Sequence, residues 1–203
     1  MTLHPMISFG NIQWRILVEQ PDRMLLLADD IVALRDYHSK SEDTTWANGE
    51  IRHYLNHDFY LQFSPSEQAN ILLTCNQNNG NPWYHTLVAD ETWDKIFLLS
   101  LDEVVRDYFG DSSLLLDFPH PKQRYWFQRK DVHNEQRRAL FLGSPWWWWL
   151  RTAGKNQRTA IYIHGDGNVG IQGNGVGKRH VNVIHPVNKD SRGGIRPALW
   201  LKK

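Results

Sequence analysis

The N-terminal part of the chain begins with two short segments that have the pattern of β-strands. Residues 12–18 alternate between apolar and polar side chains, and an apolar run over residues 23–28 follows directly after Pro21 and Asp22. Alternation with a period of two places one set of side chains on each face of a strand. The pattern therefore predicts an N-terminal β-hairpin.

Helical signals follow this hairpin. Over residues 49–60, apolar side chains recur at the spacing of one helix face, at Ile51, Tyr54, Leu55 and Phe59. Ser64-Pro-Ser-Glu67 is a capping box with proline at the first helical position, and it predicts a second helix that ends near Leu73. A second capping box, Ser100-Leu-Asp-Glu103, predicts a helix that ends near Tyr108.

Three further segments complete this part of the chain. The polar tract over residues 76–82 predicts a loop, and the apolar run over residues 95–100 predicts a buried strand. Residues 121–142 are amphipathic and rich in charge, which predicts partly helical structure.

The character of the sequence changes after Gly143. Helix signals stop, and short alternating segments predict strands over residues 160–164, 168–172, 180–184 and 195–201. Predicted strands flank the glycines of residues 165–167 and 173–177 on both sides. A phosphate loop needs a helix after its glycines, so these glycines are better explained as turn residues. No linker is evident. The fold class predicted is α+β: one domain over residues 1–203, with a helical scaffold over 1–143 and an antiparallel β-meander over 144–203.

Composition narrows the function only slightly. The 203 residues carry a formal net charge of +1, which gives no reason to expect nucleic acid or an anionic membrane as partner. No apolar stretch approaches the roughly 20 residues that span a bilayer, and no signal peptide is evident, so we expect a cytoplasmic protein unless another export route operates. Ten tryptophans, four of them consecutive at positions 146–149, favour a recognition role.

Candidate catalytic and metal-binding residues are sparse. His53 and His57 lie four residues apart on a predicted helix, beside Asp58, and this spacing can place two imidazoles on one metal ion. A half-exposed helix face explains them better, because the glutamate of an HExxH motif is missing. The single cysteine, Cys75, has no neighbouring base in the sequence and is interpreted as incidental. We predict no cofactor, no metal and no catalytic residue.

The C-terminal segment has a regular face and an irregular face. Ile161, Ile163, Val169 and Ile171 recur on one side of the predicted strands, as do Val181 and Val183. The opposite side mixes aromatic, basic and amide side chains with glycine and isoleucine. One face therefore suits a core, and the other is typical of a recognition surface, although an ordinary polar face remains the alternative.

A series of motifs along nearly the whole chain resembles the bacterial DUF6273 family. The motifs are Trp14-Arg-Ile-Leu17, Ile51-Arg-His-Tyr-Leu-Asn56, Phe63-Ser-Pro-Ser-Glu67, Lys95-Ile-Phe-Leu-Leu-Ser100, Trp148-Trp-Leu-Arg151, Asp166-Gly-Asn-Val169 and Gly194-Ile-Arg-Pro-Ala-Leu-Trp200. The resemblance implies a C-type-lectin-like fold, similar to formylglycine-generating enzymes and to the variable proteins of diversity-generating retroelements. It also implies that residues 148–151 build the core, and that Arg196 and Pro197 close the C-terminal strand.

The resemblance favours a binding protein over an enzyme. Formylglycine-generating enzymes depend on active-site cysteines, and this chain has only Cys75; the related sulfoxide synthases need a histidine-rich metal site. Retroelement variable proteins display irregular exposed residues near the C-terminus, as this chain does. Trp146 and Trp147 exceed the family motif, so we expect them to be exposed anchors, since at most two of four consecutive strand residues face one side.

We therefore predict a ligand-binding protein for a protein or glycan, and two alternatives stay open. The predicted contact residues are Trp146, Trp147, Lys155, Asn156, Arg158, Tyr162, His164, Asn168, Gln172, Asn174, Lys178, Arg179, His180, Asn182, Ile184, His185 and Lys189. The alternatives are a metal-dependent oxidase of the formylglycine-generating type, and an interaction subunit of a larger complex.

Overall fold

A computed structural model describes residues 4–117, 119, 131–177 and 184–203. In these residues the fold is α+β but mostly β, with 36% strand against 19% helix. Helices occur before residue 143 as expected, and strands run through that part of the chain as well. No helix in these ranges is long and apolar enough to cross a membrane.

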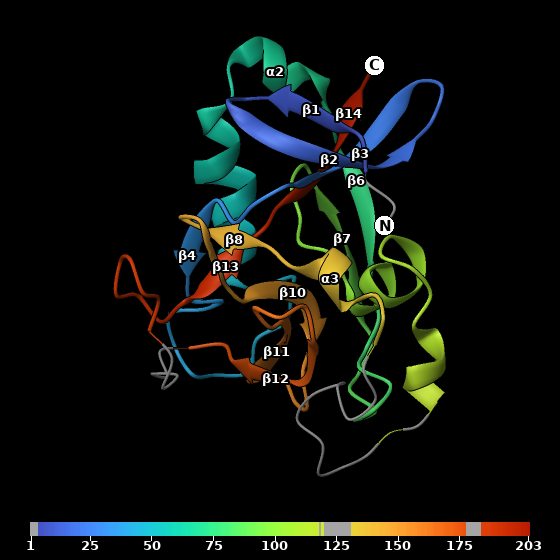
Figure 1. The fold of residues 1–203 in the computed structure, drawn as a ribbon, viewed down its shortest axis with the longest axis vertical. Coiled ribbons are helices and arrows are strands. Elements are labelled where there is room, and N and C mark those ends of the chain that lie inside the picture. Colours follow the sequence, from blue (N-terminus) through green and yellow to red (C-terminus); the bar gives the residue numbers. More distant parts are fainter. Residues whose placement is uncertain (1–3, 118, 120–130, 178–183) are drawn as a thin grey trace.

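The first sheet joins the two ends of the chain. It consists of β1 (Met6–Phe9), β2 (Ile12–Glu19), β3 (Arg23–Ala28), β14 (Ala198–Lys202) and β5 (Ile71–Leu72), in this order and all antiparallel. It occupies the upper part of the molecule in Figure 1. The predicted hairpin is confirmed, since β2 pairs with β3 from Trp14 opposite Ala28 to Glu19 opposite Met24.

The second sheet contains the predicted meander. Its order is β12 (Val169–Gly175), β11 (Thr159–Ile163), β10 (Trp148–Ala153), β13 (Gly193–Ile195) and β4 (Ala33–Arg35). Strands β10 to β12 are antiparallel as predicted, whereas β13 runs parallel to β10. Gly167, with a φ of 86°, lies between β11 and β12, which confirms its interpretation as a turn residue. Gly173, with a φ of 82°, lies within β12 and not in a turn.

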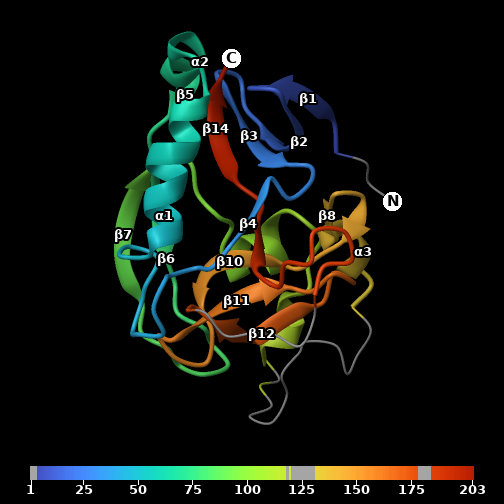
Figure 2. The ribbon, with the colours of Figure 1, turned by 90° about the vertical axis from the view of Figure 1, so that its left-hand side faces the viewer.

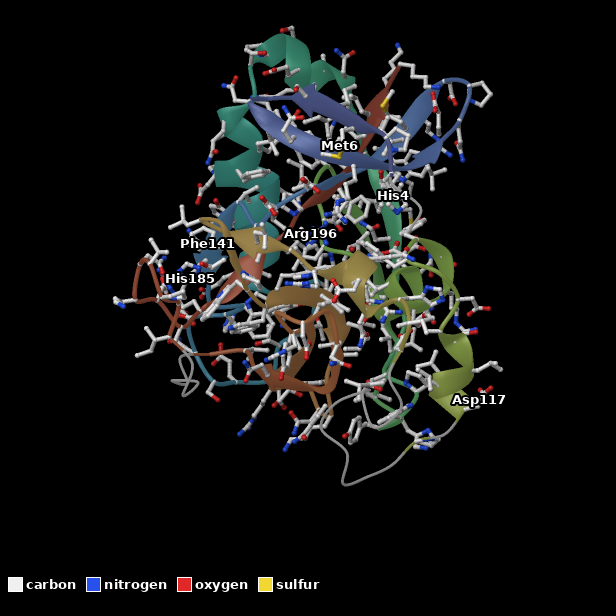
Figure 3. All side chains as sticks on the ribbon, viewed as in Figure 1. His4, Met6, Asp117, Phe141, His185 and Arg196 are labelled. Carbon is white, nitrogen blue, oxygen red and sulfur yellow. The ribbon has the colours of Figure 1, made fainter. Side chains whose placement is uncertain are left out.

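The predicted strand over residues 195–201 is two strands in two different sheets. β13 ends at Ile195 and β14 begins at Ala198, with Arg196 and Pro197 between them. The buried Arg196 guanidinium donates to the carbonyl oxygens of Ala28 (2.9 Å) and Asp29 (3.0 Å), at the point where β3 also leaves the first sheet. Figure 3 shows Arg196 in the middle of the molecule. The residue therefore ties together the two crossings between the sheets.

The first predicted helix is confirmed and the second is shorter than predicted. α1 (Glu50–Tyr54) continues through the π-helical turn η1 (Leu55–Phe59) into the 3-10 turn η2 (Tyr60–Gln62), and Figure 2 shows α1 alongside β14 and β3. The capping box of α2 (Pro65–Asn70) is present, with the Glu67 carboxylate accepting from the Ser64 amide at 2.7 Å. The helix ends at Asn70, because Ile71 and Leu72 pair with β14.

The structure of residues 74–108 differs from the sequence-based prediction in two places. β6 (Thr74–Asn78) pairs with β7 (Ala89–Asp94), so the first half of the predicted loop is a strand. The predicted strand over residues 95–100 is largely buried, but among the described residues its β-pairing consists of one isolated β-bridge, between Phe97 and Ala198. The capping box that follows is confirmed: the Ser100 amide donates to Glu103 at 2.7 Å, before the π-helical turn η3 (Glu103–Asp107).

The remaining described elements are short. They are η4 (Ser113–Asp117), α3 (Asn134–Arg137), β8 (Leu140–Phe141) and β9 (Ser144–Pro145). Of the segment over 121–142, residues 121–130 lie outside the described residues, and the rest is helical only in α3. Of the predicted strand over 180–184, only Ile184 is described, and it lies in a loop.

A buried carboxylate joins four of these segments. The Asp94 side chain has no solvent exposure. Its Oδ1 accepts from Arg52 Nε (2.6 Å) and Asn56 Nδ2 (3.3 Å) on the α1–η1 helix. Its Oδ2 accepts from Trp46 Nε1 (3.0 Å), Asn76 Nδ2 (2.9 Å) and Thr92 Oγ1 (2.8 Å). Because buried charge is costly unless it is paired and hydrogen-bonded, this carboxylate holds all five donors in place.

Replacing Asp94 with alanine is expected to lower the free energy of unfolding by about 3 kcal/mol or more, because the buried donors lose their acceptor. Urea unfolding followed by circular dichroism measures the change. Asp90→Ala is the matched control, because Asp90 lies on the same strand, β7, and its side chain is exposed. Equal losses for the two variants would contradict the central role of Asp94.

Candidate functional site

A cleft lies where three segments meet: residues 43–46, residues 78–89, and residues 151–157 at the end of β10 and in the turn that follows. Its inner part is a cavity of about 130 Å³, and an open depression of about 430 Å³ adjoins it. The two share Thr86, Leu87 and Gln157. The cavity is further lined by Thr45, Trp46, Asn78, Asn79, Val88, Ala89, Arg151, Thr152 and Ala153; the depression is further lined by Asp43, Tyr84, His85 and Asn156.

Asn81 shapes the loop between β6 and β7 that forms one wall. Its buried amide donates to the carbonyl oxygens of Ile171 (2.8 Å) and Gly154 (3.3 Å), and its Oδ1 accepts from the Trp83 amide (3.0 Å). The Asn81 backbone amide donates to Thr86 Oγ1 at 2.7 Å. Asn81 therefore holds the loop in its own conformation and anchors it to β12 and to the end of β10.

The opposite wall is tied to the β10–β11 turn. The Thr44 amide donates to the carbonyl oxygen of Gln157 at 2.8 Å, and Arg158 Nε lies 2.8 Å from Asp43 Oδ1. The ion pair is exposed on both sides, so it stabilises the rim only weakly. The backbone hydrogen bond from Thr44 to Gln157 and the hydrogen bond from Trp46 to Asp94 therefore fix this wall.

The deeper wall of the cavity contains Arg151, which is buried. Its two terminal nitrogens bind Glu103 in a bidentate pair at 2.6 and 3.1 Å, and they also donate to the carbonyl oxygens of Leu98 (2.8 Å) and Gln77 (3.2 Å). Trp148, Trp149, Leu150 and Arg151 are all buried, which confirms the expectation that they build the core.

Two buried polar atoms of the cavity-lining residues have no hydrogen-bond partner in the described part of the chain. They are Nε of Arg151 and Oδ1 of Asn78. The other Asn78 atom, Nδ2, donates to the Asp90 carbonyl oxygen at 2.7 Å, so the side chain cannot simply turn over. A buried polar atom without a partner costs roughly 1–3 kcal/mol of stability.

The cleft offers hydrogen bonding and apolar contact together. Leu87 and Val88 are exposed at its edge, where they are 78% and 72% accessible. Burial raises the pKa of the Tyr84 phenol, so its hydroxyl stays protonated at neutral pH. Concave sites with a few convergent polar groups among apolar ones are typical of ligand binding.

The expectation that Trp146 and Trp147 are exposed anchors is wrong. All four tryptophans of the run are at least 94% buried. Trp146 Nε1 donates to the Arg192 carbonyl oxygen (2.9 Å), and the Trp147 ring packs edge-on against Trp149 and Tyr162. Both residues precede β10, and side chains distant in the sequence cover them: the His185 ring packs edge-on against Trp146, with 5.0 Å between the ring centroids.

His185 is also buried and cannot be a surface contact. Its Nε2 lies 2.9 Å from the Phe141 carbonyl oxygen, and its Nδ1 accepts from the amides of Val187 and Asn188. The ring packs edge-on against Trp146 and Phe141. Figure 3 shows His185 close to Phe141. His185 therefore anchors the loop over residues 184–192 on the aromatic core.

The described members of the other predicted contact residues lie at both ends of β11 and along its neighbours. Lys155, Asn156 and Arg158 are exposed in the turn before β11, whereas His164 and Asn168 lie at the opposite end of that strand. Five strand residues span roughly 16 Å, so the two groups face different regions.

Several of these residues have structural partners. Asn168 bonds to Asp166 (2.9 Å) and Asn134 (3.0 Å), and His164 bonds to Asp166 (2.9 Å). Tyr162, Gln172 and Asn174 are half-buried, and Ile184 and Lys189 are exposed in the 184–192 loop. Lys178, Arg179, His180 and Asn182, with the core positions Val181 and Val183, lie outside the described residues.

The sequence offered two other candidate sites, the His53–His57 pair and Cys75. The His53 and His57 rings stack at 5.3 Å on an exposed helix face, and no group of three metal-ligating side chains occurs in the described ranges. Burial and the Glu91 carboxylate raise the pKa of the half-exposed Cys75 thiol, which disfavours a reactive thiolate.

Of the cleft residues, the sequence predicted only Asn156. Asn78 and Asn79 belong to the polar tract that indicated no more than a loop, and Asp43, Trp46 and Tyr84 stood in no motif. An unusual density of asparagine over residues 76–81 was the one available signal.

The fold and the cleft define an α+β protein, mostly β, with a small cavity open to the surface. The chain belongs to the DUF6273 family, described as a domain of unknown function, which matches residues 21–203. No curated protein and no solved structure matches the chain significantly.

The burial of the tryptophan run can be tested by fluorescence quenching. Trp93 is 58% exposed, whereas Trp147 is 6% exposed. We expect Trp93→Phe to lower the fraction of emission that iodide quenches, because this charged quencher reaches only exposed indoles. Trp147→Phe, the matched change, should leave that fraction unchanged in the folded protein. A similar drop for Trp147→Phe would show that this indole is exposed.

Proposed function

We infer that this protein is a ligand-binding module, and that its site is the cleft between residues 43–46, 78–89 and 151–157. The observation that carries this proposal is the pair of buried, unpartnered polar atoms, Arg151 Nε and Asn78 Oδ1, on residues that line the cavity. Folded proteins rarely leave such atoms unpaired, and functional sites are among the exceptions.

The chemistry of the cleft supports binding rather than catalysis. Its lining groups are amides, hydroxyls, aromatic rings and short aliphatic side chains, which donate, accept and pack. The one carboxylate in the lining, Asp43, is exposed and paired with Arg158. The deeper charge, on Arg151, is paired with Glu103.

The rim of the cleft extends the surface available to a larger partner. Lys155, Asn156 and Arg158 stand on one side, and Leu87 and Val88 stand on the other. A macromolecular ligand could insert a small group into the cavity while its body rests on this rim. The proposal thus keeps a protein or glycan as the ligand and moves the centre of the site from the tryptophan run to the cleft.

The binding site can be tested by NMR on the ¹⁵N-labelled protein with small probes: glucose, acetamide, acetate and methylammonium. We expect at least one probe at millimolar concentration to shift the Trp46 indole resonance and the Asn78 side-chain amide, because a bound group contacts the cavity wall. Met6, which is exposed on β1 of the first sheet, serves as the internal control. If all four probes leave the cleft resonances unmoved, the proposal fails.

A finer form of the proposal is that the scaffold is C-type-lectin-like and that its C-terminal segment is diversified by a retroelement. In that case the variable codons should fall on exposed positions, such as 155, 156, 158, 184 and 189. Codons 146, 147 and 185 should be constant, because their side chains pack in the core.

Sequencing several kilobases around the gene tests this finer form. We expect a reverse transcriptase gene and a near-copy of codons 146–200 that differs mainly at adenines of those exposed positions. A near-copy whose differences fall on the buried codons, or the absence of both features, would contradict diversification and leave a fixed surface.

A further inference from the structure

The loop between β6 and β7 holds two aliphatic side chains in solvent, Leu87 and Val88. Contacts within the loop constrain its backbone. The Thr86 amide donates to the Asn81 carbonyl oxygen at 3.3 Å, and Thr86 Oγ1 accepts from the Asn81 amide. Gly80 lies so close to the Thr86 carbonyl that a Cβ at this position would clash with it. A constrained loop that exposes adjacent apolar side chains is typical of an interaction site.

The cavity behind this pair presents mostly apolar surface. Leu87 and Val88 line it together with Ala89 and Ala153. Several polar side chains of the same lining have hydrogen-bond partners within the protein: Thr45 with Asn48 (3.0 Å), Trp46 with Asp94 (3.0 Å), Asn79 with Asp102 (3.1 Å), Thr86 with the Asn81 amide (2.7 Å) and Thr152 with the Leu101 amide (2.9 Å). A charged or hydroxylated group placed against this lining would lose bonds to water, whereas an aliphatic group would not.

The volumes limit the size of the occupant. The cavity measures about 130 Å³, and the open depression of about 430 Å³ that adjoins it shares Leu87 in its lining. An apolar cavity of about 150 Å³ accommodates a benzene molecule, so this one holds a branched aliphatic group of about four carbons. The broader depression leaves room for a larger body that carries this group.

The lining of the depression favours a peptide as that body. It includes the amide side chains of Asn156 and Gln157. Amide side chains both donate and accept hydrogen bonds, as the peptide groups of a backbone do. Leucine, isoleucine and valine are short branched aliphatic groups on such a backbone, whereas a sugar ring carries hydroxyls in place of aliphatic branches.

We propose that the cleft binds a segment of a partner protein through one branched aliphatic side chain of about the size of leucine. This side chain enters the cavity, Leu87 and Val88 pack around it, and the backbone of the segment lies in the depression. The inference rests on the proposed function and selects protein over glycan as the ligand.

The test compares blocked amino acids that share one backbone. N-Acetyl-leucine-N-methylamide is titrated into the ¹⁵N-labelled protein, with the Trp46 indole and Ala89 backbone amide resonances as readout. The asparagine compound is the matched control, because its side chain has the same branching and is polar; the alanine compound lacks the branch. We expect the leucine compound to bind at least about tenfold more tightly than either, since burial of each additional carbon group is favourable.

Variants of the protein locate the bound compound. Leu87→Ala should weaken binding of the leucine compound about threefold or more, because this side chain lines the cavity and is 78% exposed. Leu114→Ala is the matched control: Leu114 is 73% exposed and lines neither the cavity nor the depression, so affinity should not change.

A filling variant tests the cavity itself. Ala153→Leu places a larger side chain in the lining and should weaken binding of the leucine compound tenfold or more. Circular dichroism checks that this variant folds. If it does not, Leu87→Ala still decides the location, because an exposed side chain is removed there with little effect on folding.

The outcomes distinguish this inference from the proposal on which it rests. Equal affinity for the leucine and asparagine compounds would overturn the aliphatic side chain and leave ligand binding in the cleft standing. Tighter binding of glucose than of the leucine compound would overturn the protein ligand and retain the site. An equal loss for Leu87→Ala and Leu114→Ala would place the compound outside the cleft and overturn the inference. If neither these compounds nor the small probes move the cleft resonances, both proposals fail.

Discussion

The structure depends on a buried carboxylate that has no exposure to solvent. Asp94 binds donors from the loop before α1, from the helix itself and from both strands of the β6–β7 pair. Two of these donors, Arg52 and Asn56, lie four residues apart on one helix face, and both belong to the motif over residues 51–56. The motif therefore has a physical explanation: it places the donors that a buried charge requires.

The same network positions the cleft. Trp46, held by Asp94, lines the cavity on one side, and Asn78 ends the strand β6 that Asn76 anchors to Asp94. Arg151 reaches the cavity from the second sheet through its pair with Glu103, whose position is set by the capping box at Ser100. Residues that line the cavity are thus tied to two ion pairs, Arg52–Asp94 and Arg151–Glu103, of which the Asp94 and Arg151 side chains are buried. Rigid walls of this kind let a small site hold unpaired polar atoms without collapsing.

The sequence predicted those parts of the fold that local interactions determine. The hairpin of β2 and β3, the helix from Glu50 and the two capping boxes follow from side chains within a few residues of one another. The errors occur where contacts between segments distant in the sequence determine the secondary structure. Ile71 and Leu72 leave the predicted helix because β14 pairs with them, and residues 195–201 divide into two strands because Arg196 bonds to the end of β3.

The tryptophan run shows why the site was misplaced. Alternation along β10 correctly places neighbouring indoles on opposite faces, but it does not reveal whether a face is covered, and here both are. Large aromatic side chains lower the free energy most when fully buried, so a run of four is as consistent with a central strand as with a binding surface. A binding site needs groups whose interactions are incomplete in the folded chain. Asn78 and Arg151 each keep one buried atom without a partner among the described residues, and the bonds of Arg151 reach segments 48 to 74 residues away, which no local pattern in the sequence records.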